Sequence, residues 1–254
     1  MAKPTLGVFG LTGCAGDQLA LLDCERELLR IVELVDLRDF LMASTAVDDE
    51  CQLDVALVEG VVASRRDETA LRRIRSRARL LGALGTCAVW GGVPAMDRTL
   101  DRARAASEIY GPAADGYDAL AVRALYEVVR VDFSLTGCPV GGGELLAAFA
   151  SLLRGDLPLA PTRPVCAECR ERENACLFER ASVVCCGPVT AGGCDALCPQ
   201  HGIACVGCRG PAVDANLEGW TALLAGRGVD PREALAKASA FAKRPSLSWQ
   251  GAPR

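Results

Sequence analysis

Short apolar runs alternate with amphipathic segments along the first 155 residues of this 254-residue chain. Several runs have almost no polar position, which is typical of strands buried on both faces. Between them, apolar residues recur with the period of a helix that has one buried face. The pattern predicts strands over residues 5–11, 32–37, 53–59, 79–86 and 129–135, and helices over 18–31, 65–77 and 144–154.

Alternating strands and helices favour right-handed crossovers, and therefore a mostly parallel, doubly wound α/β sheet. Prolines 158, 161 and 164 then interrupt regular structure. We expect a first domain over residues 1–157 and a small, loop-rich, cysteine-rich domain over 158–254. A last helix is predicted to begin at Pro231, because proline suits the first helical turn. Residues 246–254 are expected to be a loose or partner-bound tail.

The charge pattern adds little to this picture. The chain is 50% hydrophobic with a net charge of −4, so bulk attraction to nucleic acid or acidic membranes is not expected. No apolar stretch approaches the roughly 20 residues that span a bilayer. The basic segment 65–79 also carries acidic and apolar residues at helical spacing, which indicates a solvated helix face. The N-terminus lacks an export signal, so we expect a cytoplasmic protein.

The cysteines change the picture. Nine of the fourteen lie between Cys166 and Cys208. Thiols at this density need disulfide partners or metal, and without an export route metal is favoured, mainly zinc or iron-sulfur. We expect this segment to be short loops with almost no apolar core of its own. The spacings are nearly mirrored, as Cys166-x2-Cys169-x6-Cys176 and Cys198-x6-Cys205-x2-Cys208.

Three further cysteines follow predicted strands. Cys14, Cys87 and Cys138 each come after a strand and are flanked by glycines. The carboxyl ends of parallel strands meet at one edge, where α/β sheets gather ligands. Glycine lets backbone amides approach a bulky inorganic group. Asp17, in a Cys-x-x-Asp motif, would be a fourth ligand, although aspartate before a helix is also a favoured N-cap.

Other residues have simpler interpretations. Cys24 and Cys51 are expected to be small buried hydrophobic residues. The glycines at positions 7, 10 and 13 would alternatively cradle a phosphate, but neither GxGxxG nor GxxxxGK[ST] is present.

The segments GLTGCAGDQLALLD, VALVEG, LGTCAVWGGV and DFSLTGCPVGGGELL, in this order, resemble the small, electron-transferring subunit of nickel-iron hydrogenases. The run PVCAEC, CCGPVTAGGCDALCP and GIACVGCRGP is similar to the cytosolic branch, with the sulfhydrogenase delta and deazaflavin-coenzyme-reducing hydrogenase gamma subunits. The resemblance implies a flavodoxin-like domain with a proximal [4Fe-4S] cluster. Its ligands would be Cys14, Cys87 and Cys138, with Asp17 at the usual second-cysteine position.

The resemblance also implies medial and distal clusters, for which eight cysteines suffice. Cys185 matches the family ligand, and the adjacent Cys186 takes a leucine position. His201 is expected near the clusters or on the surface rather than on iron. The spacing alone does not group the ligands into clusters. The eight expected ligands are Cys166, Cys169, Cys176, Cys185, Cys194, Cys198, Cys205 and Cys208.

In such a complex hydrogen is split at a nickel-iron centre in a separate large subunit. Electrons would then pass through the three clusters to a flavin-containing partner that reduces NAD(P) or a similar carrier. Glu59, at the end of the third strand, would relay protons or instead cap nearby backbone amides. Thr12 and Gly13 are expected to shape the loop around Cys14.

Two alternatives belong to other classes. A relay subunit of an NADH dehydrogenase-like enzyme usually carries adjacent cysteines near the first loop, and Cys14-Ala15 lacks that pair. A zinc-stapled interaction module would use pairs such as Cys166/Cys169 and Cys205/Cys208. Zinc alone would leave Cys14, Cys87 and Cys138 unexplained.

Overall fold

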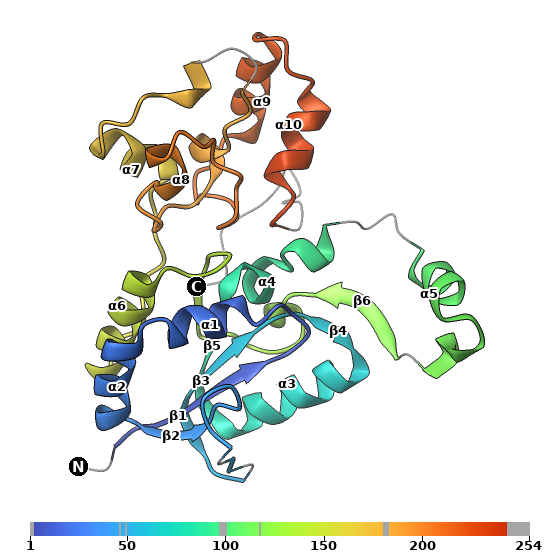
Figure 1. Cartoon of the computed structure of the whole chain (residues 1–254), viewed down its shortest axis with the longest axis vertical. Helices are drawn as coiled ribbons and strands as arrows, with labels where there is room; N and C mark the ends of the chain where they lie inside the picture. The colour runs from blue at the N-terminus through green and yellow to red at the C-terminus, as the bar shows by residue number, and fades with distance from the viewer. Residues whose placement is uncertain are drawn as a thin grey trace.

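The central element of the fold is a sheet of five parallel strands. The computed structural model describes residues 3–45, 47–48, 50–96, 101–116, 118–179 and 183–242. The strand order is β2-β1-β3-β5-β7 (Figure 1). This confirms the doubly wound sheet predicted from the sequence. The strands are β1 (Thr5–Gly10), β2 (Asp36–Asp39), β3 (Leu53–Glu59), β5 (Ala78–Leu84) and β7 (Phe133–Leu135).

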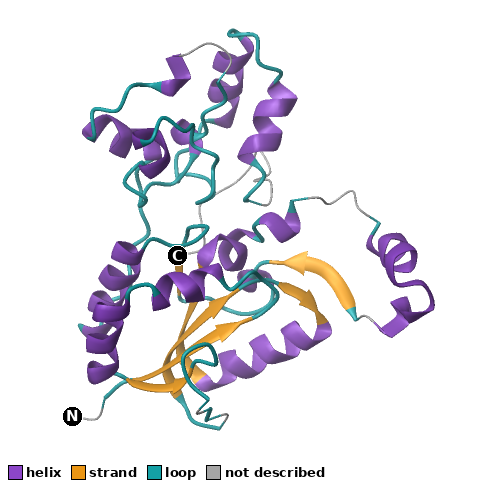
Figure 2. Cartoon of the chain, in the orientation of Figure 1, coloured by secondary structure: helices purple, strands orange, loops and turns teal. Residues whose placement is uncertain are grey.

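Helices cover both faces of the sheet (Figure 2). Along β3, Val55 and Leu57 pack into one core, while Ala56 and Val58 pack into a second core on the opposite face. This alternation explains why the strand is apolar throughout. The first core is closed by α1 (Gly16–Leu22), α2 (Glu25–Leu34) and α6 (Gly142–Leu153), and the second by α3 (Arg65–Arg77) and α4 (Gly85–Trp90).

The prediction of one helix over 18–31 followed by a strand over 32–37 is wrong. The chain breaks at Asp23 and Cys24 between α1 and α2, and α2 continues to Leu34. Ile31 and Val35, four residues apart, both pack into the first core. Residues 31–34 therefore belong to the helix, Val35 leaves it in an extended conformation, and the strand begins only at Asp36.

Two further strands are shorter than predicted. β5 ends at Leu84 rather than at residue 86, because Gly85 adopts a φ of +84° and starts α4. In the 129–135 run only Phe133–Leu135 pairs with the sheet. The preceding backbone includes a short 3-10 turn, η3 (Leu125–Glu127).

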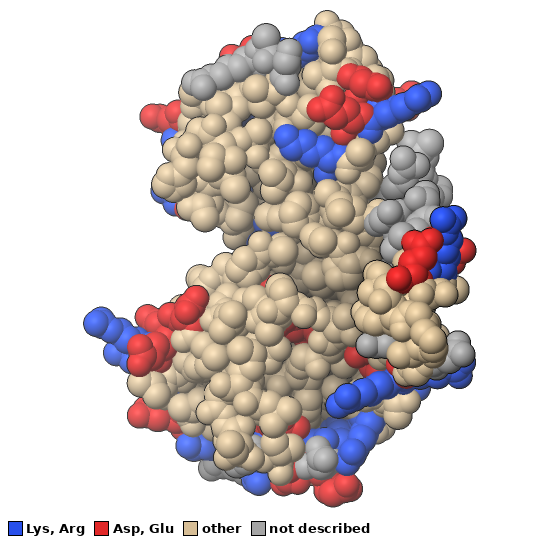
Figure 3. Space-filling model, turned by 45° about the vertical axis from the view of Figure 1, so that its right-hand side comes forward, with Lys and Arg blue, Asp and Glu red and all other residues tan. Residues whose placement is uncertain are grey.

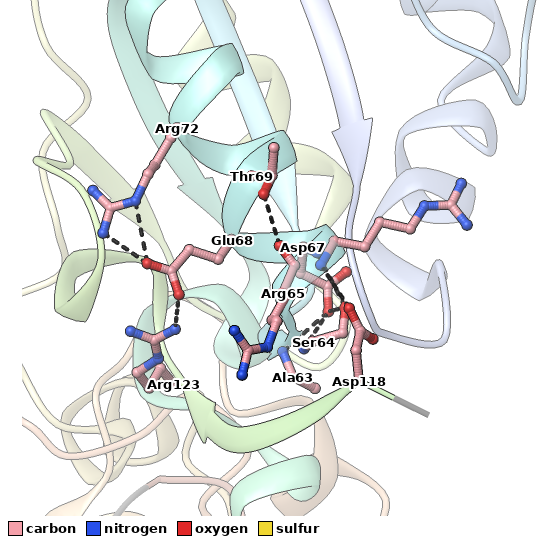
Figure 4. A network of polar contacts seen from close by, with 10 residues as sticks. Ala63, Ser64, Arg65, Asp67, Glu68, Thr69, Arg72, Asp118 and Arg123 are labelled. Atoms are coloured by element: carbon pink, nitrogen blue, oxygen red, sulfur yellow. Dashed lines mark hydrogen bonds and ion pairs between the residues drawn. The ribbon is translucent and has the colours of Figure 1, made fainter. Parts of the chain in front are cut away.

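A small projection was not predicted. β4 (Val62–Ser64) and β6 (Ala119–Arg123) form an antiparallel pair, with α5 (Arg102–Tyr110) and η2 (Gly111–Gly116) beyond it (Figure 1). The basic segment on α3 is a solvated helix face, as predicted, and Figure 4 shows how it is anchored. Ser64 caps the helix by accepting a bond from the Asp67 amide, and Glu68 pairs with Arg72 and Arg123.

The C-terminal region consists of short helices joined by loops (Figure 2). The expectation of loops alone between residues 166 and 208 is wrong, since α7 and α8 lie there. Its core is also larger than expected, because Trp220 and Leu224 from a later helix pack onto Val165 and Val189. The elements are α7 (Val165–Glu171), η4 (Leu177–Glu179), η5 (Gly187–Val189), α8 (Leu197–Gln200), α9 (Leu217–Ala225) and α10 (Pro231–Ala238).

The helix predicted at Pro231 is confirmed as α10, with Asp230 accepting a bond from the Arg232 amide at its start. The tail expected over 246–254 lies outside the described residues. In the described part of the chain, no helix has the length and apolarity to cross a membrane.

The C-terminal region lies over the carboxyl edge of the sheet (Figure 1). Gly91, after α4, forms an isolated β-bridge with Ala242. Figure 3 shows a hollow between the two parts on one face of the molecule, with few charged side chains lining it. At this junction the Thr86 hydroxyl donates to the Cys208 carbonyl, which places Cys208 beside the carboxyl end of β5.

Candidate metal centre

The three cysteines predicted at strand ends lie at the carboxyl edge of the sheet. Cys14 is in the loop after β1, Cys87 is in the first turn of α4 after β5, and Cys138 follows β7. Cys14 and Cys138 are exposed and Cys87 is half-buried. Burial, followed by the charges of Cys138, Asp17 and Cys14, raises the pKa of Cys87 to about 12. These side chains therefore face one another.

Asp17 is not the N-cap of α1. The helix begins at Gly16, with Ala15 at the cap position in the left-handed conformation. The Asp17 side chain is buried, and its Oδ1 accepts a 2.7 Å hydrogen bond from the Val140 amide. A methyl group at Gly85 would lie 1.8 Å from Asp17 Oδ2, so only glycine leaves room for this carboxylate. The carboxylate thus points to the sheet edge rather than to its own helix.

The electrostatics of this edge suit a cation. Burial raises the pKa of Asp17 to about 6, the Val140 amide opposes that rise, and the nearby Glu59 adds to it. The same burial and proximity raise the pKa of Cys87 and Cys138. A bound metal removes this penalty, because its positive charge favours the deprotonated ligands. We call Cys14, Asp17, Cys87 and Cys138 the sheet-edge group.

Glu59, the last residue of β3, is buried beside this group. Its Oε2 accepts a 3.1 Å bond from the Gln18 amide, which is the capping role considered for it. Its role as a proton relay stays a prediction. Nearby, Thr12 donates to Asp67 Oδ2, and a methyl group at Gly13 would lie 3.2 Å from the α-carbon of Gly60. Both residues hold the loop before Cys14.

A second set of cysteines gathers around α7. Cys166 and Cys169 lie on this helix. A methyl group added at Gly187 would lie 3.1 Å from Cys166 Sγ and 3.6 Å from Cys185 Sγ, so the two sulfurs flank this glycine. Burial, then Cys185, Cys169 and Cys176, raises the pKa of Cys166 to about 12. We call Cys166, Cys169, Cys176 and Cys185 the outer group.

A third set lies between the outer group and the sheet. Burial, followed by the proximity of Cys194 and Cys198, raises the pKa of Cys208 to about 11, and Cys138 of the sheet-edge group contributes as well. Cys205 is buried, and its amide donates to Cys185 Sγ at 3.4 Å. Cys205 therefore adjoins Cys185 of the outer group. We call Cys194, Cys198, Cys205 and Cys208 the inner group.

The remaining candidates are not assigned to these groups. Cys24 and Cys51 are half-buried rather than fully buried, and their thiols donate to the carbonyls of Ala20 and Asp48. Cys186 is completely buried beside Cys185. His201 is exposed at the end of α8, which agrees with a surface position.

Thr86 was missed by the sequence reasoning. It is 1% exposed, and its hydroxyl donates to the Cys208 carbonyl at 2.6 Å and accepts from the Gly137 amide at 3.0 Å. Thr86 thus joins the residues beside Cys87 and Cys138 to the inner group. Its position next to Cys87 in the chain was the signal that could have revealed it.

Known proteins resemble this chain in sequence and in fold. The family model described as NADH ubiquinone oxidoreductase, 20 Kd subunit, matches residues 14–152. The chain is 38% identical over 232 residues to sulfhydrogenase 2 subunit delta of Pyrococcus furiosus, covering 91% of this chain and 96% of the relative. It is 31% identical over 180 residues to NAD-reducing hydrogenase HoxS subunit delta of Cupriavidus necator, covering 63% of this chain and 85% of the relative.

Among solved structures, NAD+-reducing [NiFe]-hydrogenase in the H2-reduced state matches with a TM-score of 0.56 and 29% identity. The match covers 63% of this chain and 96% of that chain. An actinobacterial-type NiFe-hydrogenase from Ralstonia eutropha shares the fold, with a TM-score of 0.59 over 93% of this chain.

The chain belongs to the family of the 20 kDa subunit of NADH ubiquinone oxidoreductase. Within that family it is a small subunit of the nickel-iron hydrogenase type, a class of oxidoreductases whose active site lies in a separate subunit. The resemblance stated from the sequence motifs is confirmed.

Proposed function

We propose that this chain relays electrons from hydrogen oxidation in a separate large subunit to a flavin-containing partner that reduces NAD(P) or a similar carrier. The observation that carries the proposal is the placement of Cys14, Cys87 and Cys138 at one sheet edge near the buried carboxylate of Asp17, with the inner group adjoining through Thr86. Three ligand sets thus follow one another from the sheet edge into the C-terminal region.

Each group has four side chains suited to one [4Fe-4S] cluster, which supplies one-electron transfer when bound. The sheet-edge group would hold the proximal cluster, with Asp17 as the carboxylate ligand. The inner group would hold the medial cluster and the outer group the distal one. Cys205 is assigned to the inner group because the outer group already has four thiols. A carboxylate is a harder donor than a thiolate, so Asp17 would change the proximal potential.

Two independent domains would fit these roles. We propose the boundary at residues 157 and 158, as the proline pattern predicts. The apolar cores support it, since one pair of cores is built mainly on the sheet and a separate one lies between Val165 and Ala234. The first domain would meet the large subunit, and the second would lead electrons away.

The exposure of the ligands supports this arrangement of partners. Cys14 and Cys138 are exposed at the sheet edge, and Cys176 is exposed in the outer group. A cluster whose ligands reach the surface exchanges electrons readily with a docked protein. We propose that the large subunit covers the sheet-edge group and that the flavin-containing subunit covers the outer group. We further propose a cytoplasmic complex.

The zinc alternative fits the geometry less well. Over the described ranges, no three His, Cys, Asp or Glu side chains converge closely enough to hold a single metal ion. A tetrahedral zinc site requires such convergence, whereas ligands around a four-iron cluster are spread more widely. A relay subunit of an NADH dehydrogenase-like enzyme would belong to the same family. It differs from the proposed hydrogenase subunit in that hydrogen is not the electron donor.

The test uses the complex co-purified anaerobically with its large subunit. We expect hydrogen to reduce the NAD(P)-linked carrier in the wild type. Cys87→Ser should abolish that reduction while hydrogen-deuterium exchange at the large subunit continues, and Cys51→Ser should behave as wild type. Unchanged carrier reduction by Cys87→Ser, or a wild-type complex inert to hydrogen, would reject the proposal.

A further inference from the structure

Arg209 is a fully buried charge at the junction of the two regions. It directly follows Cys208, and its side chain is 2% exposed. The guanidinium Nε donates to the Gly192 carbonyl at 2.5 Å, and Nη2 donates to Glu144 Oε1 at 2.8 Å. Burying an arginine is costly unless it is paired and hydrogen-bonded, and both conditions hold here.

Its partner comes from the other region. Glu144 lies in the first turn of α6, and its side chain is 14% exposed. Within the described residues, its second oxygen, Oε2, is buried without a hydrogen-bond partner. Such an arrangement is expensive for a merely structural ion pair, because one oxygen is desolvated without compensation.

Arg209 lies close to the sulfurs of the inner group, and Glu144 is joined to that group through its ion pair with Arg209. The positive charge of Arg209 opposes the rise in pKa that burial imposes on Cys208 and Cys194. Glu168 is the other carboxylate beside Cys194, and it accepts bonds from the amides of Gly193 and Ala196. Because Arg209 is buried, solvent ions screen its charge little. Arg209 therefore brings a positive charge to one metal group, and Glu144 brings the opposing carboxylate. Burial raises the pKa of Glu144, and the bond from Arg209 opposes that rise and favours the charged form.

We propose that the buried Arg209–Glu144 pair sets the reduction potential of the cluster held by the inner group, with Arg209 raising that potential and Glu144 lowering it. The reason is electrostatic, since a nearby positive charge stabilises an added electron and a negative charge destabilises it. The inference rests on the proposed function, because it requires a cluster at this group. It makes Arg209 and Glu144 tuning residues that do not themselves bind iron.

The experiment is a redox titration of the intact complex followed by electron paramagnetic resonance. We expect Arg209→Gln to shift the inner-group midpoint to more negative values and Glu144→Gln to more positive values. Each shift should change the oxidised-to-reduced ratio at the wild-type midpoint about tenfold, which corresponds to about 59 mV for one electron. The double variant should return close to the wild-type midpoint, and Arg209→Lys should stay near it.

The matched control is Arg172→Gln. Arg172 also pairs with a carboxylate, Asp195, in the C-terminal region, but this pair is exposed. The control removes the same charge and should leave the midpoint unchanged.

Two results would overturn the inference: single variants that shift the midpoint in the same direction, or normal signals with no shift. If the complex with Arg209→Gln fails to assemble, the midpoint potentials of Glu144→Gln and Arg209→Lys still test the inference. A wild-type complex without iron would instead reject the proposed function, so the two failures are distinguishable.

Discussion

The sheet-edge group and the two C-terminal groups are positioned by different means. Cys14, Cys87 and Cys138 stand at the ends of strands whose side chains fill two apolar cores. The outer and inner groups are attached to short helices and turns around a smaller core. A site on a sheet edge exists before metal binds, whereas clustered cysteines in loops need metal to organise the chain. The first region should therefore tolerate metal loss better than the second.

The largest effect is expected from removing an outer-group ligand. Cys166→Ala should release much of residues 158–242 to rapid proteolysis, because the metal contribution to folding is lost. Residues 5–153 should keep their protection from hydrogen exchange. Limited proteolysis with hydrogen-exchange mass spectrometry measures both, and Cys51→Ala is the matched control. If both regions lost the same protection from proteolysis and hydrogen exchange, the expected difference in their dependence on metal would be wrong.

A core substitution should act in the opposite region. Leu57 is 1% exposed at the centre of the first core. Leu57→Ala should lower the free energy of unfolding by about 2–5 kcal/mol, because it removes apolar contacts and leaves a cavity. Iron bound by the C-terminal region should be unchanged under native conditions. Leu29 is exposed, so Leu29→Ala should change the free energy of unfolding measured in urea by less than about 0.5 kcal/mol. If the two variants lowered the free energy of unfolding equally, the packing argument would be contradicted.

Thr86 tests how tightly the two regions are joined. Thr86→Val keeps the shape but leaves the Cys208 carbonyl and the Gly137 amide without their hydroxyl partner. We expect the free energy of unfolding to fall by about 1–3 kcal/mol and the hydrogen of the Gly137 amide to exchange faster with solvent. Thr86→Ser retains the hydroxyl and should preserve slow exchange. Slow exchange in the valine variant would mean that the regions are joined by other contacts.

The smallest effect concerns Asp132, which precedes β7. Burial opposes its ionisation, but the Leu81 amide and the Arg75 guanidinium outweigh burial and hold its pKa below the usual 3.8. A lowered folded-state pKa stabilises the protein above pH 3.8, and this stability is lost as the pH falls further.

Asp132→Asn should therefore cost about 1 kcal/mol at pH 7. The difference from wild type should shrink below pH 3.8 in urea titrations. Arg130→Gln, which removes a mostly exposed partner, is the control. A pH-independent difference would show that geometry rather than charge matters at this position.

Much of the sheet region was predictable from the sequence, because its apolar runs are buried on both faces. The boundary between α2 and β2 was missed, since the apolar residues 31–35 suit a helix face as well as a strand. The projection of β4 and β6 was missed because its strands are short. At the site, cysteine positions were visible in the sequence. The buried location of Asp17 depends on Gly85 and Val140, which lie far away in the chain.

The C-terminal region was less predictable. Cysteine spacing predicted a metal-binding segment but not which thiols lie together, since that depends on turns such as the one at Gly187. Arg209 and Glu144 come from different regions, and their pairing depends on tertiary packing. Local patterns cannot reveal a contact of this kind.

The central claim is that three separate groups hold three iron-sulfur clusters. The most direct test is to measure iron, sulfide and zinc in the anaerobically purified chain, with low-temperature electron paramagnetic resonance on the same sample. We expect about 12 iron and 12 sulfide per chain, and an Asp17→Cys variant that alters one signal alone. Zinc with little iron would contradict the claim and leave a zinc-stabilised scaffold.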